Sequence, residues 1–258
     1  MKNLSELQAF LESGYQHYLP HVSIDCAIFG YHEGEMKLLL LKNKLIPNWC
    51  LPGGFIKREE GLDEAAGRIS KERTGIKNLF LKQFKTFGDP DRNGYRSFDQ
   101  KKFFKLTGIH IPTDSWLLDR TTSIGFYAIT DISNATPEAD MLSSECAWFP
   151  IDQIPKLAFD HNEMVKEALL TMRVHLYHYP IGKNMLPEKF TLKEIHLFYE
   201  TMLGKTLNPS NFPNKLISLG LLEKLDEKRS IGPHRAPTFY KFNTKVYSKA
   251  LKEGLVLA

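Results

Sequence analysis

The fold of the N-terminal part is decided by the stretch Gly53-Gly-Phe-Ile-Lys-Arg-Glu-Glu-Gly-Leu-Asp-Glu-Ala-Ala-Gly-Arg-Ile-Ser-Lys-Glu-Arg-Thr-Gly-Ile76. Its first residues predict the end of a strand followed by a glycine loop. The part from about Glu60 to Arg73 predicts a helix. Such a loop and helix together can line a cleft with charged side chains.

The spacing of this stretch resembles a Nudix box, whose pattern is Gly, five residues, Glu, seven residues and then Arg-Glu-apolar-any-Glu-Glu-any-Gly-apolar. The residues that fall on this pattern are Gly54, Glu60, Arg68, Glu72, Gly75 and Ile76. Ile69 and Arg73 stand where two carboxylates belong, and Ser70 stands at an apolar position. The framework of the motif is present, but two ligands of its metal site are missing.

A complete Nudix box implies hydrolysis of a nucleoside diphosphate derivative, with Mg²⁺ held by carboxylates beside the pyrophosphate. Acids at i, i+3 and i+4 of one helix point to the same face, and here these positions are Ile69, Glu72 and Arg73. Arg73 would repel a bound cation by on the order of several kcal/mol at low effective dielectric. We therefore expect no enzyme, no metal ion and no other cofactor. The alternative is an active Mg²⁺-dependent hydrolase of ADP-ribose or a related compound.

The candidate effector contacts in this part of the chain are all charged. Glu60, Arg68 and Glu72 of the box either line a ligand cleft or form a salt-bridged helix surface. Arg92 and Arg96 belong to a loop rich in turn formers, which either reaches the mouth of the cleft or remains solvated.

Composition indicates a globular protein, because 42% of the 258 residues are hydrophobic and 25% are charged. No run approaches the roughly 18 apolar residues of a membrane span, and charges interrupt the N-terminus too early for a signal peptide. The three cysteines, Cys26, Cys50 and Cys146, are widely spaced and form no CxxC pair. This spacing indicates free thiols, no zinc site and a reducing compartment. We expect a cytoplasmic protein without a membrane partner.

The chain around the box predicts an α/β fold, an α/β/α sandwich with a mixed sheet. A short amphipathic helix is expected over residues 4–18. A capping box at Asp160-His-Asn-Glu163 predicts a helix through about Val174. Residues 98–120 have no clear period and are interpreted as an inserted loop or hairpin. Strands are expected at residues 22–30, 36–42, 79–87, 121–130 and 145–150.

The C-terminal part predicts two helices and a hairpin, which is the order of a winged helix-turn-helix. Thr191-Leu-Lys-Glu194 is a capping box that opens a helix ending at Gly204. Asn208-Pro209 opens a second helix over residues 210–219. The strands of the wing are expected at residues 221–225 and 238–242, with a basic turn between them.

The charge distribution of this C-terminal part fits either a polyanion partner or a solvated basic face. From residue 181 onward thirteen Lys and Arg face seven Asp and Glu, whereas the first 180 residues carry a net charge of −2. In a winged helix the second helix enters the major groove of DNA while basic residues of the wing meet phosphates. The expected DNA contacts are Asn211, Asn214, Lys215, Lys228, Arg229, His234 and Arg235. The alternative is a winged helix that serves only as a protein-contact module.

Both parts together resemble the Nudix-related transcriptional regulators, the NrtR family, and especially its Bacteroidetes-type branch with the arabinose regulator AraR. The resemblance covers about residues 20–250 except the insertion. It rests on the altered box and on the motifs Phe190-Thr-Leu-Lys-Glu194, Phe198-Tyr-Glu200, Asn211-Phe212 and Gly232-Pro-His-Arg-Ala-Pro-Thr-Phe-Tyr-Lys-Phe242.

The resemblance implies a Nudix-like domain that senses a small molecule, which is ADP-ribose in regulators of NAD metabolism and a sugar in the arabinose type. We therefore expect a sugar, a sugar phosphate or ADP-ribose as effector. The resemblance also implies a homodimer that binds a palindromic operator, with Asn211, Lys215 and Arg235 on the DNA. The expected parts are an N-terminal helix (1–20), an effector domain (21–178), a linker (179–188) and the winged helix (189–258). The insertion departs from the family outline beside the expected effector pocket.

Overall fold

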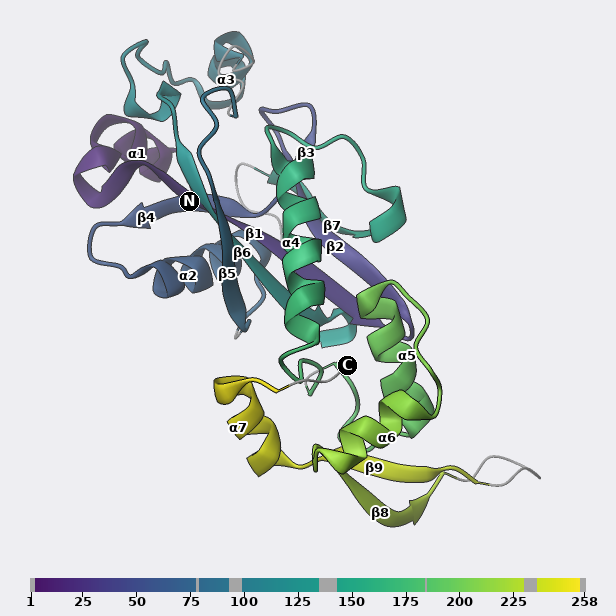
Figure 1. Cartoon of the computed structure of the whole chain (residues 1–258). Coiled ribbons are helices and arrows are strands. Elements are labelled where there is room, and N and C mark those ends of the chain that lie inside the picture. The colour runs from purple at the N-terminus through teal and green to yellow at the C-terminus, as the bar shows by residue number, and fades with distance from the viewer. Residues whose placement is uncertain are drawn as a thin grey trace. The chain divides into compact units, whose positions relative to one another are not determined.

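The computed structural model describes residues 3–77, 79–92, 99–134, 143–183, 185–229 and 236–255. The chain divides into two compact units, whose elements are labelled in Figure 1. Unit 1 comprises Met1–Gly30 and Lys37–Leu169, and unit 2 comprises Tyr31–Met36 and Leu170–Ala258. Unit 2 therefore includes a short piece of chain that precedes most of unit 1.

Unit 1 is built on a sheet. In the described part of the chain seven strands form it, in the order β3-β2-β1-β6-β5, with β4 paired to β1 and β7 paired to β2. The strands are β1 (Tyr18–His32), β2 (Glu35–Asn43), β3 (Trp49–Cys50), β4 (Gly53–Lys57), β5 (Leu81–Phe87), β6 (Thr122–Asp131) and β7 (Ser143–Pro150). Four consecutive leucines of β2, residues 38–41, are fully buried, so this strand is an apolar run rather than an alternating one. The five predicted strands and the α/β class are confirmed.

The box helix is α2 (Leu62–Thr74), which follows β4 as predicted. Its buried side, Ala65, Ala66 and Ile69, belongs to an apolar core cluster together with residues of β1, β2 and β6. The helix ends at Gly75, whose φ of 73° is left-handed and suits glycine. The apolar face of α2 thus fixes the box against the sheet.

The insertion contains a helix, so the prediction of a loop or hairpin over residues 98–120 was wrong. The Asp99 carboxylate accepts the Lys102 N–H at 2.9 Å and opens α3 (Gln100–Thr107), which Gly108 closes at a φ of 72°. Eight residues are too few to show a clear helical period. Leu7 and Leu11 of α1 (Leu4–His17) share an apolar cluster with α3 and the residues after it. The insertion is therefore a packed part of unit 1.

Unit 2 contains the predicted winged helix. Its elements are α5 (Leu192–Leu203), α6 (Asn211–Ser218), β8 (Leu222–Lys228), β9 (Thr238–Phe242) and α7 (Thr244–Glu253). Thr191 and Glu194 form both bonds of the predicted capping box, and Gly204 ends α5 in the left-handed region. The Asn208 side chain accepts the Asn211 N–H at 2.8 Å, although α6 itself starts only at Asn211.

Helix α7 was not predicted. It begins where the Asn243 side chain accepts the Val246 N–H at 3.1 Å. Tyr247 of α7 is buried, with its ring 5.1 Å from that of Phe242. The helix thus extends the apolar core of the winged helix beyond the wing.

Two elements cross the boundary between the units. Helix α4 (His161–Leu176) begins in unit 1 and ends in unit 2, and the turn between β1 and β2 also belongs to unit 2. Within unit 2, Thr201 Oγ1 of α5 donates to the Gly34 carbonyl at 3.1 Å, and Arg173 Nε of α4 donates to the Met202 carbonyl at 3.4 Å. Both crossing elements are thus bonded to α5.

The remaining elements are short 3-10 turns, η2 (Trp116–Leu118), η3 (Ile132–Asn134) and η4 (Ile151–Gln153). Among the described residues no helix is long and apolar enough to cross a membrane.

Candidate functional site

The charged residues of the box are directed at one another. Arg68 donates from Nη2 to Glu60 at 2.8 Å and from Nη1 to Glu72 at 3.1 Å. Its Nη2 also donates to the Phe55 carbonyl at 2.9 Å, which ties α2 to β4. The bond from Arg68 is the main cause of a lowered pKa of Glu60. The two box carboxylates and their arginine therefore form a salt-bridged connection between loop and helix.

The two glycines of the box give space to neighbouring side chains and are not in a tight turn. They lie in β4, where a Cβ on Gly53 would be 2.0 Å from an oxygen of Asp25. A Cβ on Gly54 would be 3.2 Å from Cγ1 of Ile69. Ile69 is 1% exposed, so a core side chain fills one of the positions that a Nudix box gives to a carboxylate.

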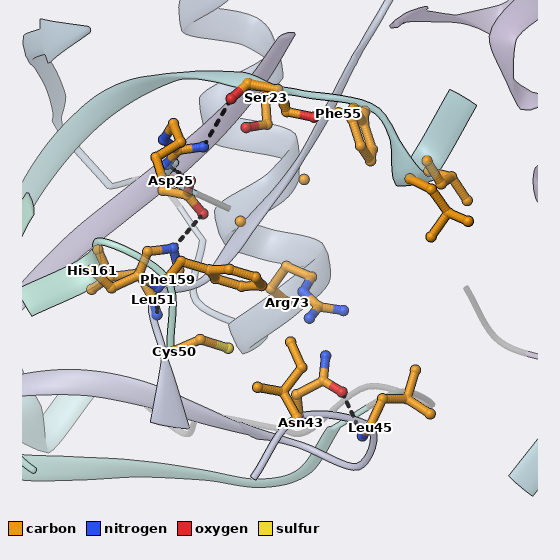
Figure 2. A pocket seen from close by; sticks show the side chains of 17 residues that line it. Ser23, Asp25, Asn43, Leu45, Cys50, Leu51, Phe55, Arg73, Phe159 and His161 are labelled. Carbon is orange, nitrogen blue, oxygen red and sulfur yellow. Dashed lines mark hydrogen bonds and ion pairs between the residues drawn. The ribbon is translucent and has the colours of Figure 1, made fainter. Parts of the chain in front are cut away.

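A cavity of about 320 Å³ lies beside the box (Figure 2). Its wall is contributed by β1, the segment from the end of β2 to β4, the end of α2, the segment before β6 and the start of α4. Arg73 reaches the cavity from the last turn of α2, and Leu117 and Leu118 of the insertion form part of its apolar wall. Segments far apart in the sequence thus enclose one pocket of the size that binds small molecules.

A buried polar network forms one side of this cavity. Asp25 accepts a bond from Ser123 Oγ at 2.6 Å and lies 3.6 Å from His161 Nε2. Arg92 donates two bonds of 2.9 Å to Asp160 and lies 3.8 Å from Asp25. The Arg92 side chain is only 3% exposed, so its charge depends on these two carboxylates.

His161 is held as a neutral side chain within the network. Its Nδ1 accepts the Leu51 N–H at 2.9 Å, so the proton of the neutral ring lies on Nε2, which faces Asp25. Burial is the main cause that lowers the pKa of His161. His161 therefore positions Leu51, which follows β3, and Asp25.

Phe159 lines the cavity and has an unusual backbone conformation. Its φ is 55°, a conformation that is costly for a bulky residue, and its side chain is 46% exposed. The ring lines the cavity and lies 5.2 Å from that of His161. An exposed aromatic ring in a strained position beside a pocket can serve as a stacking surface for a ligand ring.

Of the predicted effector residues that the structure describes, only one lines the cavity. Arg92 lines the cavity, although Asp160 and Asp25 hold its charge. Glu60, Arg68 and Glu72 are not among the described residues that line it. Arg96 lies outside the described residues. The lining residues Asp25 and Phe159 carry no ligand signal in the sequence, whereas Arg73 departs visibly from the box pattern.

The predicted DNA-binding helix presents polar side chains on one face. Asn211, Asn214 and Lys215 of α6 are exposed, whereas Phe212 and Leu216 are buried. The ring of Phe212 lies 4.8 Å from that of Tyr199 on α5, so the helix is anchored by its apolar face. The polar face is therefore oriented away from the core of unit 2.

The predicted wing residues are only partly described. Arg229 donates to Glu194 of the capping box at 2.8 Å, and its guanidinium lies 5.1 Å from the Phe239 ring. Lys228 is exposed at the end of β8. His234 and Arg235 lie outside the described residues. The Arg229 side chain thus has an internal role in this unit, in addition to the DNA contact predicted for it.

Two family descriptions match the chain in succession. Residues 19–168 match the NUDIX domain, and residues 182–242 match the NrtR DNA-binding winged helix domain. Among curated proteins, the ADPR responsive transcriptional repressor NtrR of Acinetobacter baylyi is 26% identical over 255 residues, covering 95% of this chain and 92% of the relative. The ADP-ribose pyrophosphatase of Methanocaldococcus jannaschii is 29% identical over 159 residues, covering 60% of this chain and 77% of the relative.

Solved structures share the fold. Shewanella oneidensis NrtR in complex with a 27mer DNA superposes with a TM-score of 0.65 at 22% identity, covering 88% of this chain and 95% of that one. A MutT/nudix family protein from Enterococcus faecalis superposes with a TM-score of 0.63 at 20% identity, covering 94% of this chain and 100% of that one.

Proposed function

The chain belongs to the NrtR family, which joins a NUDIX domain to a DNA-binding winged helix, and on that premise we propose that it is an effector-responsive transcriptional regulator. The observation that carries this proposal is the exposed polar face of α6, with Asn211, Asn214 and Lys215, inside the matched winged helix. In this type of domain the second helix reads the major groove. The relative from A. baylyi is named as a repressor, and repression is the sign we propose.

A nucleotide sugar such as ADP-ribose is the effector that we propose for the NUDIX domain, because the same relative is named as ADPR responsive. The alternative effector is a free sugar, as in the arabinose-type branch, or a sugar phosphate. The cavity of about 320 Å³ supports a small-molecule ligand of either kind, since it combines charged side chains with the aromatic ring of Phe159.

We further propose that the chain is divided into an effector domain (21–178), a linker (179–188) and a winged helix (189–258). We also propose that it forms a homodimer. A palindromic operator requires two winged helices whose separation matches the half-sites. An effector that binds one dimer geometry more tightly shifts the population toward it and changes operator affinity.

We propose that the NUDIX domain is not a hydrolase. A Mg²⁺ ion does not fit the residues of the box, because Ile69 offers no ligand, Arg73 adds a positive charge and Arg68 is bonded to both Glu60 and Glu72. The described residues contain no group of three His, Cys, Asp or Glu that could hold a metal ion. The alternative, an ADP-ribose hydrolase, is favoured by the similarity to the pyrophosphatase of M. jannaschii. Mg²⁺-dependent release of AMP from ADP-ribose that Glu72→Gln abolishes would establish this alternative.

Helix α4 supplies a route for the effector signal. Its first residue, His161, lines the cavity, whereas Arg173 near its other end is bonded to α5 of the winged helix. We expect Arg173→Ala to reduce the change in operator affinity that the effector causes, while affinity without effector stays the same. Lys166→Ala, an exposed residue of the same helix, is the matched control. Equal effector responses of the two variants would exclude this route.

The regulator proposal is tested by DNA binding of the purified chain. Fluorescence anisotropy should show tighter binding to a fragment from upstream of its own gene than to random DNA of equal length. The affinity should also fall steeply between 50 and 200 mM salt, as phosphate contacts require. Equal, salt-insensitive binding to both fragments would refute the regulator function.

A further inference from the structure

Arg73 occupies a distinctive position between the box and the cavity. It follows Ile69 by one turn of α2, so the two side chains lie on the same side of the helix. The side chain of Ile69 packs in the core against Gly54, whereas the side chain of Arg73 lines the cavity. Figure 2 shows the guanidinium group of Arg73 well apart from Asp25.

The cavity therefore has two electrostatically different regions. Near Asp25 the carboxylate is surrounded by Ser123, His161 and Arg92, and the charge of Arg92 is shared with Asp160. An anionic ligand group is disfavoured there, because it would meet the buried Asp25 carboxylate. At Arg73 a cation stands at a box position that would carry a metal-binding carboxylate, so an anionic group is favoured.

We propose that Arg73 binds an anionic oxygen group of the effector directly, a phosphate or a carboxylate, without a bridging metal ion. The inference rests on the proposed effector function of the NUDIX domain and names the ligand chemistry of that site. A guanidinium can donate two parallel hydrogen bonds to such a group. The ligand is oriented with its anionic end at Arg73 and its hydroxyl-bearing part toward Asp25. A neutral sugar without an anionic group binds weakly.

Ligand titration in EDTA tests this assignment on the full chain. The probes are ribose 5-phosphate, ribonate and ribose, which carry a phosphate, a carboxylate and no anionic group on a similar skeleton. Calorimetry should show at least tenfold tighter binding of one or both anionic probes than of ribose. Arg73→Gln should lower that affinity at least tenfold, and Arg73→Lys should retain part of it because the positive charge remains.

The matched control is Lys71→Gln, which removes the same charge from the same last turn of α2 at an exposed position outside the cavity wall. Its affinity for the anionic probes should equal that of the wild type. Thermal melting should show that Arg73→Gln and Lys71→Gln remain folded. The proposal is overturned if the two variants bind the anionic probes equally well, if EDTA removes binding by the wild type, or if no anionic probe binds. Operator binding without effector is a separate measurement, so a failure of the regulator function is distinguishable from a failure of this assignment.

Discussion

Helices α2 and α6 both carry polar residues that the sequence motifs single out, and they present these residues in opposite ways. On α2 the motif arginine Arg68 is bonded to Glu60 and Glu72, within one short stretch of chain. On α6 the side chains of Asn211 and Lys215 are exposed. Motif charges that satisfy one another hold the fold together, whereas polar groups left to solvent keep their bonding capacity for a partner.

The largest effect is expected where charges are satisfied inside the fold. Arg92→Ala leaves Asp160 and Asp25 without their buried cation, so we expect a loss of about 3–5 kcal/mol in the free energy of unfolding. Urea unfolding measures this loss. The exposed Arg120, which donates to the Gly88 carbonyl, is the control, and its change to Ala should cost less than about 1 kcal/mol. Similar losses of stability in the two variants would show that the buried ion pairs of Arg92 stabilise the fold no more than the exposed Arg120 does.

A smaller effect is expected at the box itself. The pKa of Glu60 is lowered because Arg68 stabilises its ionised form. Ionised Glu60 therefore contributes stability above its ordinary pKa, and this contribution is lost as the pH falls through the lowered value. Arg68→Ala should cost roughly 1–3 kcal/mol near neutral pH and should flatten the loss of stability on the acid side. An unchanged pH profile of unfolding, with the same slope in acid as the wild type, would argue against the pairing.

At α6 the change should appear in DNA binding and hardly in stability. Lys215→Ala removes one proposed phosphate contact, so the slope of log affinity against log salt should fall by about one. The free energy of unfolding should stay within about 0.5 kcal/mol of the wild type, because the side chain is exposed. Lys249→Ala, on the exposed side of α7, is the control and should leave the slope unchanged. A salt slope equal to that of the control would show that Lys215 does not contact a DNA phosphate.

The smallest change in DNA binding is expected at Arg229, whose side chain is both bonded within unit 2 and predicted to contact DNA. Its bond to Glu194 is partly exposed, so Arg229→Ala should cost no more than about 1 kcal/mol of stability. Because the same guanidinium is engaged with Glu194 and Phe239, the salt slope should change less than in Lys215→Ala. Parallel salt titrations of the two variants decide this order.

Much of the fold followed from local sequence signals. The box spacing predicted α2, and Thr191 with Glu194 predicted the start of α5, because both signals act within a few residues. The apolar run at residues 36–42 predicted the strand β2. Helix α3 escaped prediction because its eight residues span barely two turns, although Asp99 and Gly108 mark its two ends.

The cavity was much less accessible to sequence reasoning. Asp25 and Phe159 reach it from segments more than a hundred residues apart, and long-range contacts such as that of His161 with Asp25 bring these segments together. The strain at Phe159 is a backbone property that no residue pattern signals. Arg73 was recognisable as a departure from the box, but its direction into the cavity depends on how α2 packs against the sheet.

The central claim, that a ligand of the NUDIX domain controls DNA binding, is tested most directly by one titration. The full chain is bound to labelled upstream DNA at constant salt, and ADP-ribose is added while fluorescence anisotropy is recorded, with ribose 5-phosphate and arabinose in parallel. We expect a saturable fall in anisotropy with at least one ligand, and a weaker response of Arg73→Gln to the anionic ligands. Saturable binding of such a ligand in calorimetry without any change in DNA affinity would contradict it.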